Sequence, residues 1–199
     1  SQYRRDRLEA ALAAAREAVN RSTNFAFGWA RVAELEFSFG RIHAARVAVE
    51  RSLQLAPRNA QAHALKGFLA AARHDIPEAI GSFEQAIAID PALGNAWLGR
   101  GLCRIHQGQA EAGRLDLQVA ATTEPQRALL RSYLGKAFSH AGDNPRAAKE
   151  LELAKKLDPH DPTAWLYSAL LDQQRNRIND GIRDLQTSER LGDNRRLYR

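Results

Sequence analysis

The sequence predicts an all-α protein built from repeated helical hairpins, and three observations lead to this fold class. Alanine and leucine dominate the 199 residues, whereas the 7 prolines and 13 glycines are scattered, which favours helices over strands. Prolines recur every 34 residues, at Pro57, Pro91, Pro125 and Pro159. Small residues recur in the same phase. A fixed period of this length is typical of stacked repeats.

The segment 1–25 is expected to form one helix. Between Arg7 and Asn20 a single helical face carries the apolar residues Leu8, Leu12, Ala15, Ala18 and Val19. In the phase of the prolines, this helix is the second helix of a truncated preceding repeat.

Five repeats of 34 residues follow, at 26–59, 60–93, 94–127, 128–161 and 162–195, and the tail is 196–199. Each proline stands at position 32 of its repeat, and repeat 5 has Asp193 there. Proline lacks an amide hydrogen and disfavours helix in the residue before it, so the second helix of each repeat should end at this point.

A break in the middle of each repeat is expected at position 15. This position holds Gly40, His74, Gly108, Gly142 and Asn176. Each repeat is therefore expected to contain two helices of about a dozen residues joined by a tight turn.

Residues of similar size recur at other positions with the same 34-residue period as the prolines. Position 4 holds Trp29, His63, Trp97, Arg131 and Trp165, and position 8 holds Ala33, Gly67, Gly101, Gly135 and Ala169. Position 20 holds Ala45, Ala79, Gly113, Ala147 and Gly181. Small residues let helix backbones approach closely, and the large residue at position 4 is expected to fill the gap beside them.

These positions resemble the tetratricopeptide repeat (TPR) family, and repeat 4 follows the family pattern with Leu134, Gly135, Phe138, Ala147, Leu151, Ala154 and Pro159. Departures are Lys66 and Arg100 at position 7, where leucine is usual, and Glu36 and Arg104 at position 11, where an aromatic residue is usual. The resemblance covers 26–195 and implies a right-handed α-solenoid whose first helices line a concave groove.

The resemblance also implies which side chains face that groove. They are Glu34, Phe37, Phe68, Leu98, Leu102, Ile105, Ser132, Lys136, Ser139, Leu166, Leu170 and Gln173. Exposed apolar patches commonly mark interaction sites, so we expect the groove to bind an apolar or amphipathic peptide or helix of a protein partner. The alternative is that neighbouring helices bury these side chains among themselves.

The sequence contains no recognisable motif for catalysis, for cofactor binding or for metal binding. The chain is therefore predicted not to be an enzyme and to need no cofactor. His106 and His140 share position 13, but two histidines fall short of the three or four ligands that zinc requires. Gly135 and Lys136 lack the remainder of a phosphate-binding loop. The single cysteine, Cys103, cannot form an internal disulfide and is expected to be a small buried residue.

The net charge is +6, from 29 Lys and Arg against 23 Asp and Glu, and the excess lies near the two ends. This distribution favours a solvated surface over a nucleic-acid interface, and binding of RNA or another polyanion through the arginine-rich ends is kept as an alternative. No apolar run is long enough to span a bilayer, and no signal peptide is recognised.

The sequence contains no methionine, which indicates a piece of a longer protein, and the tail resembles a junction in large bacterial TPR proteins. A spacer or assembly module of a secretion or envelope protein is therefore a further alternative. The compartment is left open between the cytoplasm, as the default, and the periplasm. Finally, the last helix is expected to carry an apolar stripe that no following repeat covers, formed by Ile178, Ile182, Leu185 and Leu191. This stripe predicts that the chain can form homo-oligomers.

Overall fold

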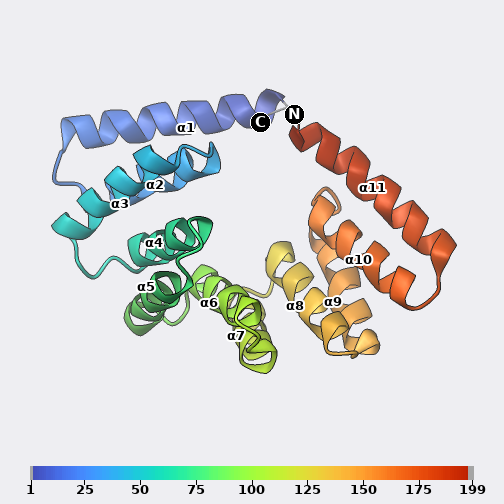
Figure 1. Cartoon of the computed structure of the whole chain (residues 1–199). Helices are drawn as coiled ribbons and strands as arrows, with labels where there is room; N and C mark the ends of the chain where they lie inside the picture. Colours follow the sequence, from blue (N-terminus) through green and yellow to red (C-terminus); the bar gives the residue numbers. More distant parts are fainter. Residues whose placement is uncertain (1, 197–199) are drawn as a thin grey trace. The chain divides into compact units, whose positions relative to one another are not determined.

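The computed structural model describes residues 2–196, with side chains for residues 6–192. Within this range there are eleven helices and no strand, which confirms the predicted all-α class (Figure 1). The helices are α1 (Gln2–Arg21), α2 (Ala26–Ser38), α3 (Ile42–Leu55), α4 (Ala60–Ala72), α5 (Ile76–Ile89), α6 (Gly94–His106), α7 (Ala110–Thr123), α8 (Ala128–His140), α9 (Asn144–Leu157), α10 (Pro162–Gln174) and α11 (Ile178–Arg196).

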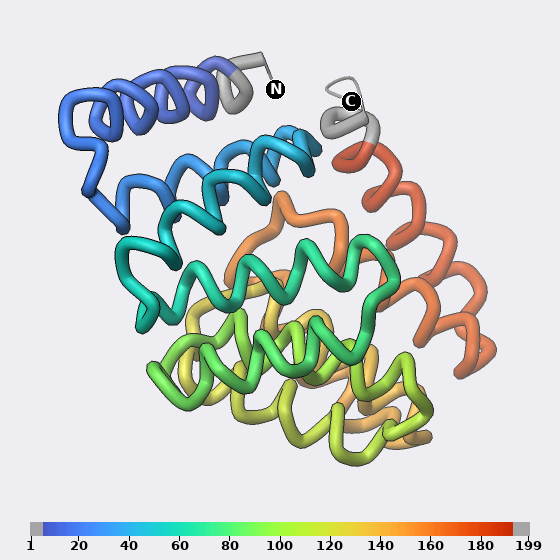
Figure 2. Tube along the Cα trace, turned by 60° about the vertical axis from the view of Figure 1, so that its left-hand side comes forward, coloured from blue at the N-terminus to red at the C-terminus, as the bar shows by residue number. Residues whose placement is uncertain are grey.

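The described helices form two compact parts, one up to residue 104 and one from residue 105 to residue 196, which we call the N-terminal and C-terminal parts. In the N-terminal part α2 packs on α3 and α4 packs on α5. In the C-terminal part α8 packs on α9 and α10 packs on α11. Figure 2 shows the two helices of each such pair running side by side. Helical hairpins are therefore the building units of both parts.

The turn inside each repeat depends on a residue with left-handed backbone conformation. The φ angle at position 15 is 71° at Gly40, 61° at His74, 83° at Gly108, 78° at Gly142 and 56° at Asn176. Glycine adopts this conformation without steric cost, and asparagine is among the residues that tolerate it best. The predicted break is confirmed in all five repeats.

Side chains at position 4 close the connection between consecutive repeats. Each donates a hydrogen bond to the carbonyl oxygen six residues earlier: Trp29 to Thr23 (3.0 Å), Trp97 to Pro91 (2.8 Å), Arg131 to Pro125 (3.4 Å) and Trp165 to Pro159 (3.0 Å). In repeat 2 the ring nitrogen Nε2 of His63 lies 2.8 Å from the carbonyl oxygen of Pro57. The residue at this position therefore satisfies a carbonyl group past the end of the preceding helix.

Small residues make room for the large residue at position 24. The Phe83 ring is fully buried, and a Cβ atom added to Gly67 of α4 would lie 2.7 Å from it. A Cβ atom on Gly99 of α6 would collide with the same ring. A Cβ atom on Gly135 would lie 2.7 Å from the Cγ atom of Leu151. The helix backbones thus approach closely because these positions lack side chains.

The departures from the family pattern at positions 7 and 11 are ion-paired in the N-terminal part. Glu36 is buried, and its carboxylate accepts hydrogen bonds from Arg16 of α1 and from Arg41, at 3.4 Å for Arg41. Similarly, Lys66 lies 3.7 Å from Glu78 in the next helix. Charged groups therefore join neighbouring helices where apolar residues are usual.

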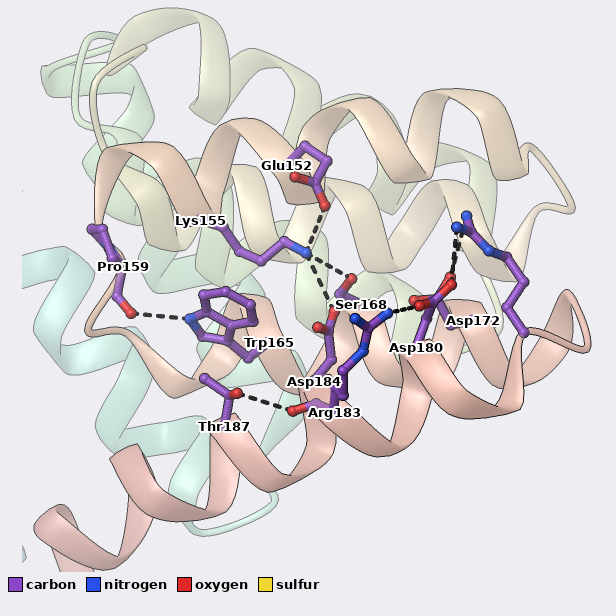
Figure 3. Close-up of polar contacts among 11 residues, drawn as sticks. Glu152, Lys155, Pro159, Trp165, Ser168, Asp172, Asp180, Arg183, Asp184 and Thr187 are labelled. Carbon is purple, nitrogen blue, oxygen red and sulfur yellow. Dashed lines mark hydrogen bonds and ion pairs between the residues drawn. The ribbon is translucent and has the colours of Figure 1, made fainter.

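In the C-terminal part, Lys155 of α9 joins three helices (Figure 3). Its Nζ atom lies 2.5 Å from Glu152 and 3.3 Å from Asp184 of α11, and it donates a hydrogen bond of 3.1 Å to Ser168 of α10. The ammonium group also lies 4.8 Å from the centre of the Trp165 ring. The Lys155 side chain is only 11% exposed, so its charge is largely withdrawn from water.

Candidate partner-binding surface

The first helices of repeats 4 and 5, α8 and α10, pack against each other and border a depression of about 510 Å³. The lining residues are Lys136, Ser139 and His140 from α8, and Tyr167, Leu170, Gln173 and Gln174 from α10. Four of the twelve predicted groove residues therefore meet here: Lys136, Ser139, Leu170 and Gln173. A fifth, Leu166, is exposed one turn before Leu170 on the same helix.

Polar contacts hold the walls of this depression in place. The Ser139 hydroxyl donates a hydrogen bond of 2.8 Å to the side-chain oxygen of Gln174, which connects α8 to α10. The Lys136 ammonium group lies 4.8 Å from the centre of the Tyr167 ring, a distance at which cations are attracted to aromatic faces. Tyr167 in turn contacts Tyr133 edge-on, with 5.8 Å between the ring centres.

The electrostatic character of the depression is cationic to neutral. None of its seven lining residues, all within the described range, is acidic, and Lys136 supplies a positive charge. Burial raises the pKa of Tyr167, with Tyr133 adding to the effect, so the phenol stays neutral and able to donate a hydrogen bond at ordinary pH. Leu170 is 45% exposed, so the surface also offers apolar area. The depression therefore combines apolar area with one positive charge and with groups that can form hydrogen bonds.

In the N-terminal part, the predicted groove residues lie on α2, α4 and α6. Glu34 forms an ion pair of 2.7 Å with Arg31 of the same helix. Phe37 is half-buried against the core of α1 to α4. Phe68 is half-buried, and its ring contacts that of Phe83 edge-on at 4.9 Å between centres. Part of the apolar surface of Phe37 and Phe68 is therefore buried in the protein's own core.

Two predicted groove residues, Leu98 and Ser132, have little surface to offer a partner. Leu98 is only 4% exposed. Ser132 is fully buried, and its hydroxyl donates a hydrogen bond of 3.1 Å to the carbonyl oxygen of Ala128 in its own helix. Position 5 therefore faces helix packing at these two sites, whereas Leu166 at the same position is exposed. Leu102 and Ile105 of α6 are half-buried.

The predicted set omitted three residues that line the depression, His140, Tyr167 and Gln174, and also Phe27, which is 65% exposed on the first turn of α2. Phe27 occupies position 2, and His140 and Gln174 occupy position 13. The TPR resemblance implies that both positions face the groove, so it could have identified these three residues. Tyr167 stands at position 6, which the pattern does not assign to the groove, and no signal in the sequence marks it.

The described residues show no grouping typical of a metal centre or a membrane span. No cluster of three or more His, Cys, Asp or Glu residues that could hold a metal ion occurs among them. None of their helices is sufficiently long and apolar to cross a bilayer. Cys103 is buried, and this burial raises the pKa of its thiol, which disfavours the reactive thiolate.

Two arginines near the start of α11, Arg177 and Arg183, are paired with acids. Arg177 lies 3.8 Å from Asp172 and 3.0 Å from Asp180, and Arg183 also pairs with Asp180. Together with Lys155, these pairs line a second depression, of about 340 Å³, between α9, α10 and α11. Because acids and bases alternate along its walls, this depression is not a concentrated cationic surface of the kind that binds polyanions.

Comparison with solved structures identifies the repeat class. The structure resembles a chain of the anaphase-promoting complex hetero-tetramer Cut9–Hcn1, with a TM-score of 0.80 and 17% sequence identity over 94% of this chain and 36% of that chain. It also resembles a tetratricopeptide repeat protein of Parabacteroides merdae, with a TM-score of 0.73 and 17% identity over 99% of this chain and 77% of the other. A third similar structure is YrrB, described as a TPR protein with an unusual peptide-binding site, with a TM-score of 0.60 and 18% identity over 94% of this chain and 97% of that chain.

At the level of sequence, the chain is similar to anaphase-promoting complex subunit 3 of Schizosaccharomyces pombe, with 28% identity over 123 residues. The matched segment is 61% of this chain and 18% of that protein, so the chain spans only a small part of the length of this relative. No protein-family model matches the sequence. The structural comparisons and the repeating positions agree: the chain has the tetratricopeptide-repeat fold.

Proposed function

We propose that this chain is a protein-interaction scaffold without catalytic activity of its own, and that its C-terminal part binds an amphipathic segment of a protein partner between α8 and α10. The observation that carries this proposal is the exposure of Leu166 and Leu170 beside a depression whose lining includes Lys136 and no acidic residue. The similar structure YrrB, a TPR protein with an unusual peptide-binding site, is consistent with such a role for a TPR fold.

The apolar surface of the exposed leucines and the positive charge of Lys136 both contribute to the proposed binding. Complete burial of a leucine side chain stabilises a complex by about 1.5–3 kcal/mol, and the two partly exposed leucines each offer a fraction of that amount. Lys136 selects for an acidic side chain on the partner, and Gln173 offers hydrogen bonds to it. Apolar burial therefore supplies affinity, and the positive charge supplies orientation and selectivity.

We propose a second, weaker contact region on the first helices of the N-terminal part, α2, α4 and α6. Glu34, Phe37, Phe68 and Leu102 remain predicted contact residues there, and Ile105 lies at the start of the C-terminal part. We give these residues a smaller role than Leu166 and Leu170, because Phe37 and Phe68 already pack on the core. Leu98 and Ser132, which are buried, are proposed to support the helices rather than to contact the partner.

The proposal is tested with model peptides of about 16 residues, a length at which a short helix becomes marginally stable. One peptide carries leucines at helical spacing with glutamates elsewhere, and a second has lysines in place of the glutamates. Binding to the full chain is measured by fluorescence anisotropy. We expect the acidic peptide to bind more tightly than the basic one, and Leu170→Glu to weaken its binding by about tenfold through lost apolar contact and charge repulsion.

The matched control is Leu115→Glu, which makes the same change at an exposed leucine of α7 and should leave binding unchanged. Equal weakening by both variants, or preference for the basic peptide, would contradict the proposal. The polyanion alternative is examined with single-stranded RNA. RNA binding that falls steeply with salt and is insensitive to Leu170→Glu would favour that alternative instead.

A further inference from the structure

The outer face of α11 has an apolar seam that is separate from the depression between α8 and α10. Ile178, Ile182 and Leu185 are 51%, 49% and 42% exposed. Their spacing of four and three residues continues to Glu189, four residues later. Alternating steps of three and four are the pattern by which two helices pack along a shared seam.

Comparison with the other repeats shows that this exposure is exceptional at Leu185. Leu185 stands at position 24, and in the four preceding repeats the equivalent residues are almost fully buried: Val49, Phe83, Leu117 and Leu151. In repeats 1 and 2 the next first helix helps to bury them, since Val49 clusters with Leu65 and Leu69 of α4, and Phe83 abuts Gly99 of α6. Position 24 is therefore built to be covered by another helix.

We propose that a second copy of this chain covers this seam, with the two α11 helices packed antiparallel about a twofold axis. In that arrangement Ile182 of each copy contacts Leu185 of the other, and a single apolar patch serves both copies, as a twofold interface requires. Leu191, the fourth residue of the predicted stripe, lies about 140° around the helix from Ile178 at 100° per residue and is half-buried, so it falls outside the seam.

The charges at the two ends of the seam favour a second copy in this orientation. Glu189 is exposed near one end, and Arg175 is exposed beside the first turn of α11 at the other end, where Arg177 is already paired with Asp172 and Asp180. Antiparallel packing brings Glu189 of each copy to the first turn of the opposite α11. A carboxylate is favoured there by Arg175 and by the partial positive charge of a helix N-terminus. A parallel arrangement would place like charges together.

Sedimentation velocity on the full chain tests the proposal. Concentrations up to about 100 µM are used, because weak dimers have dissociation constants in the micromolar range. The wild type is expected to shift reversibly from monomer to dimer as concentration rises. Ile182→Glu should weaken dimerisation at least about tenfold, because it puts a charge at the centre of the seam. Leu115→Glu, the same kind of change on α7, should leave the dimer intact, and circular dichroism should show both variants folded.

A charge-reversal pair tests the orientation. Glu189→Arg should weaken the dimer by about fivefold, and adding Arg175→Glu should restore most of the loss. A wild type that stays monomeric throughout, a dimer that survives Ile182→Glu, or a double variant weaker than Glu189→Arg alone would each overturn the proposal. The seam lies on α11, whereas the proposed peptide site lies between α8 and α10. Ile182→Glu should therefore not affect peptide binding, and the two proposals can fail separately.

Discussion

Two residues hold a backbone conformation for which glycine is better suited. His74 and Asn176 have φ angles of 61° and 56° at the position that Gly40, Gly108 and Gly142 occupy in the other repeats. Left-handed backbone disfavours a residue with a Cβ atom by about 1 kcal/mol, and less for asparagine. Repeat 2 therefore contains a local source of instability that repeats 1, 3 and 4 lack.

Replacing His74 by glycine should relieve this strain. We expect His74→Gly to stabilise the chain by about 0.5–1 kcal/mol, measured as the free energy of unfolding in urea. The control is His43→Gly, which removes the same exposed side chain from the first turn of helix α3, where no left-handed backbone is relieved, and should not stabilise the chain. Destabilisation by both variants would show that the left-handed conformation at residue 74 is not strained.

At the scale of helices, Lys155 shows how a single charge can connect three of them. It pairs with Glu152 on its own helix α9 and with Asp184 on α11, and it donates a hydrogen bond to Ser168 on α10 (Figure 3). The Asp184 side chain is only 16% exposed, so removal of the lysine would leave a poorly hydrated carboxylate. Loss of one partner from such a pair usually costs more than the intact pair contributes.

Lys155→Ala is therefore expected to destabilise the chain by about 2 kcal/mol, since the contacts are largely but not fully withdrawn from water. Lys156→Ala is the matched control, because Lys156 is the exposed neighbour on the same helix and its loss should change stability by less than about 0.5 kcal/mol. Both changes are measured by urea unfolding followed by circular dichroism. Equal effects of the two variants would show that the contacts of Lys155 contribute little.

At the scale of the whole molecule, a repeat contacts chiefly its neighbours, so that damage should spread over a limited distance. Leu151→Ala removes a fully buried side chain from α9 and is expected to cost about 3 kcal/mol. Hydrogen exchange should show the larger loss of protection in α8 to α11, and a smaller one in α2 to α5. The reverse gradient is expected for Val49→Ala, the equivalent position in repeat 1. Uniform loss of protection along the chain in both variants would indicate a single cooperative unit.

The helices and turns could be predicted because each is specified by residues close in sequence. Proline at position 32, in four repeats, and glycine, asparagine or histidine at position 15, in all five, indicate where helices end, and the 34-residue period repeats that information along the chain. Exposure of the groove residues depends instead on the helices packed beside them. Leu98 and Leu166 share position 5, yet only Leu166 is exposed, and nothing in the local sequence distinguishes the two.

The hydrogen bonds at position 4 have a spectroscopic consequence. The only three tryptophans, Trp29, Trp97 and Trp165, stand in alternate repeats, and each indole N–H is bonded to a carbonyl of the connection that precedes its own repeat. Indole fluorescence responds to loss of such a bond and to the entry of water. Variants that retain one tryptophan at a time would thus carry a built-in optical reporter at the beginning, the middle or the end of the array, with no attached dye.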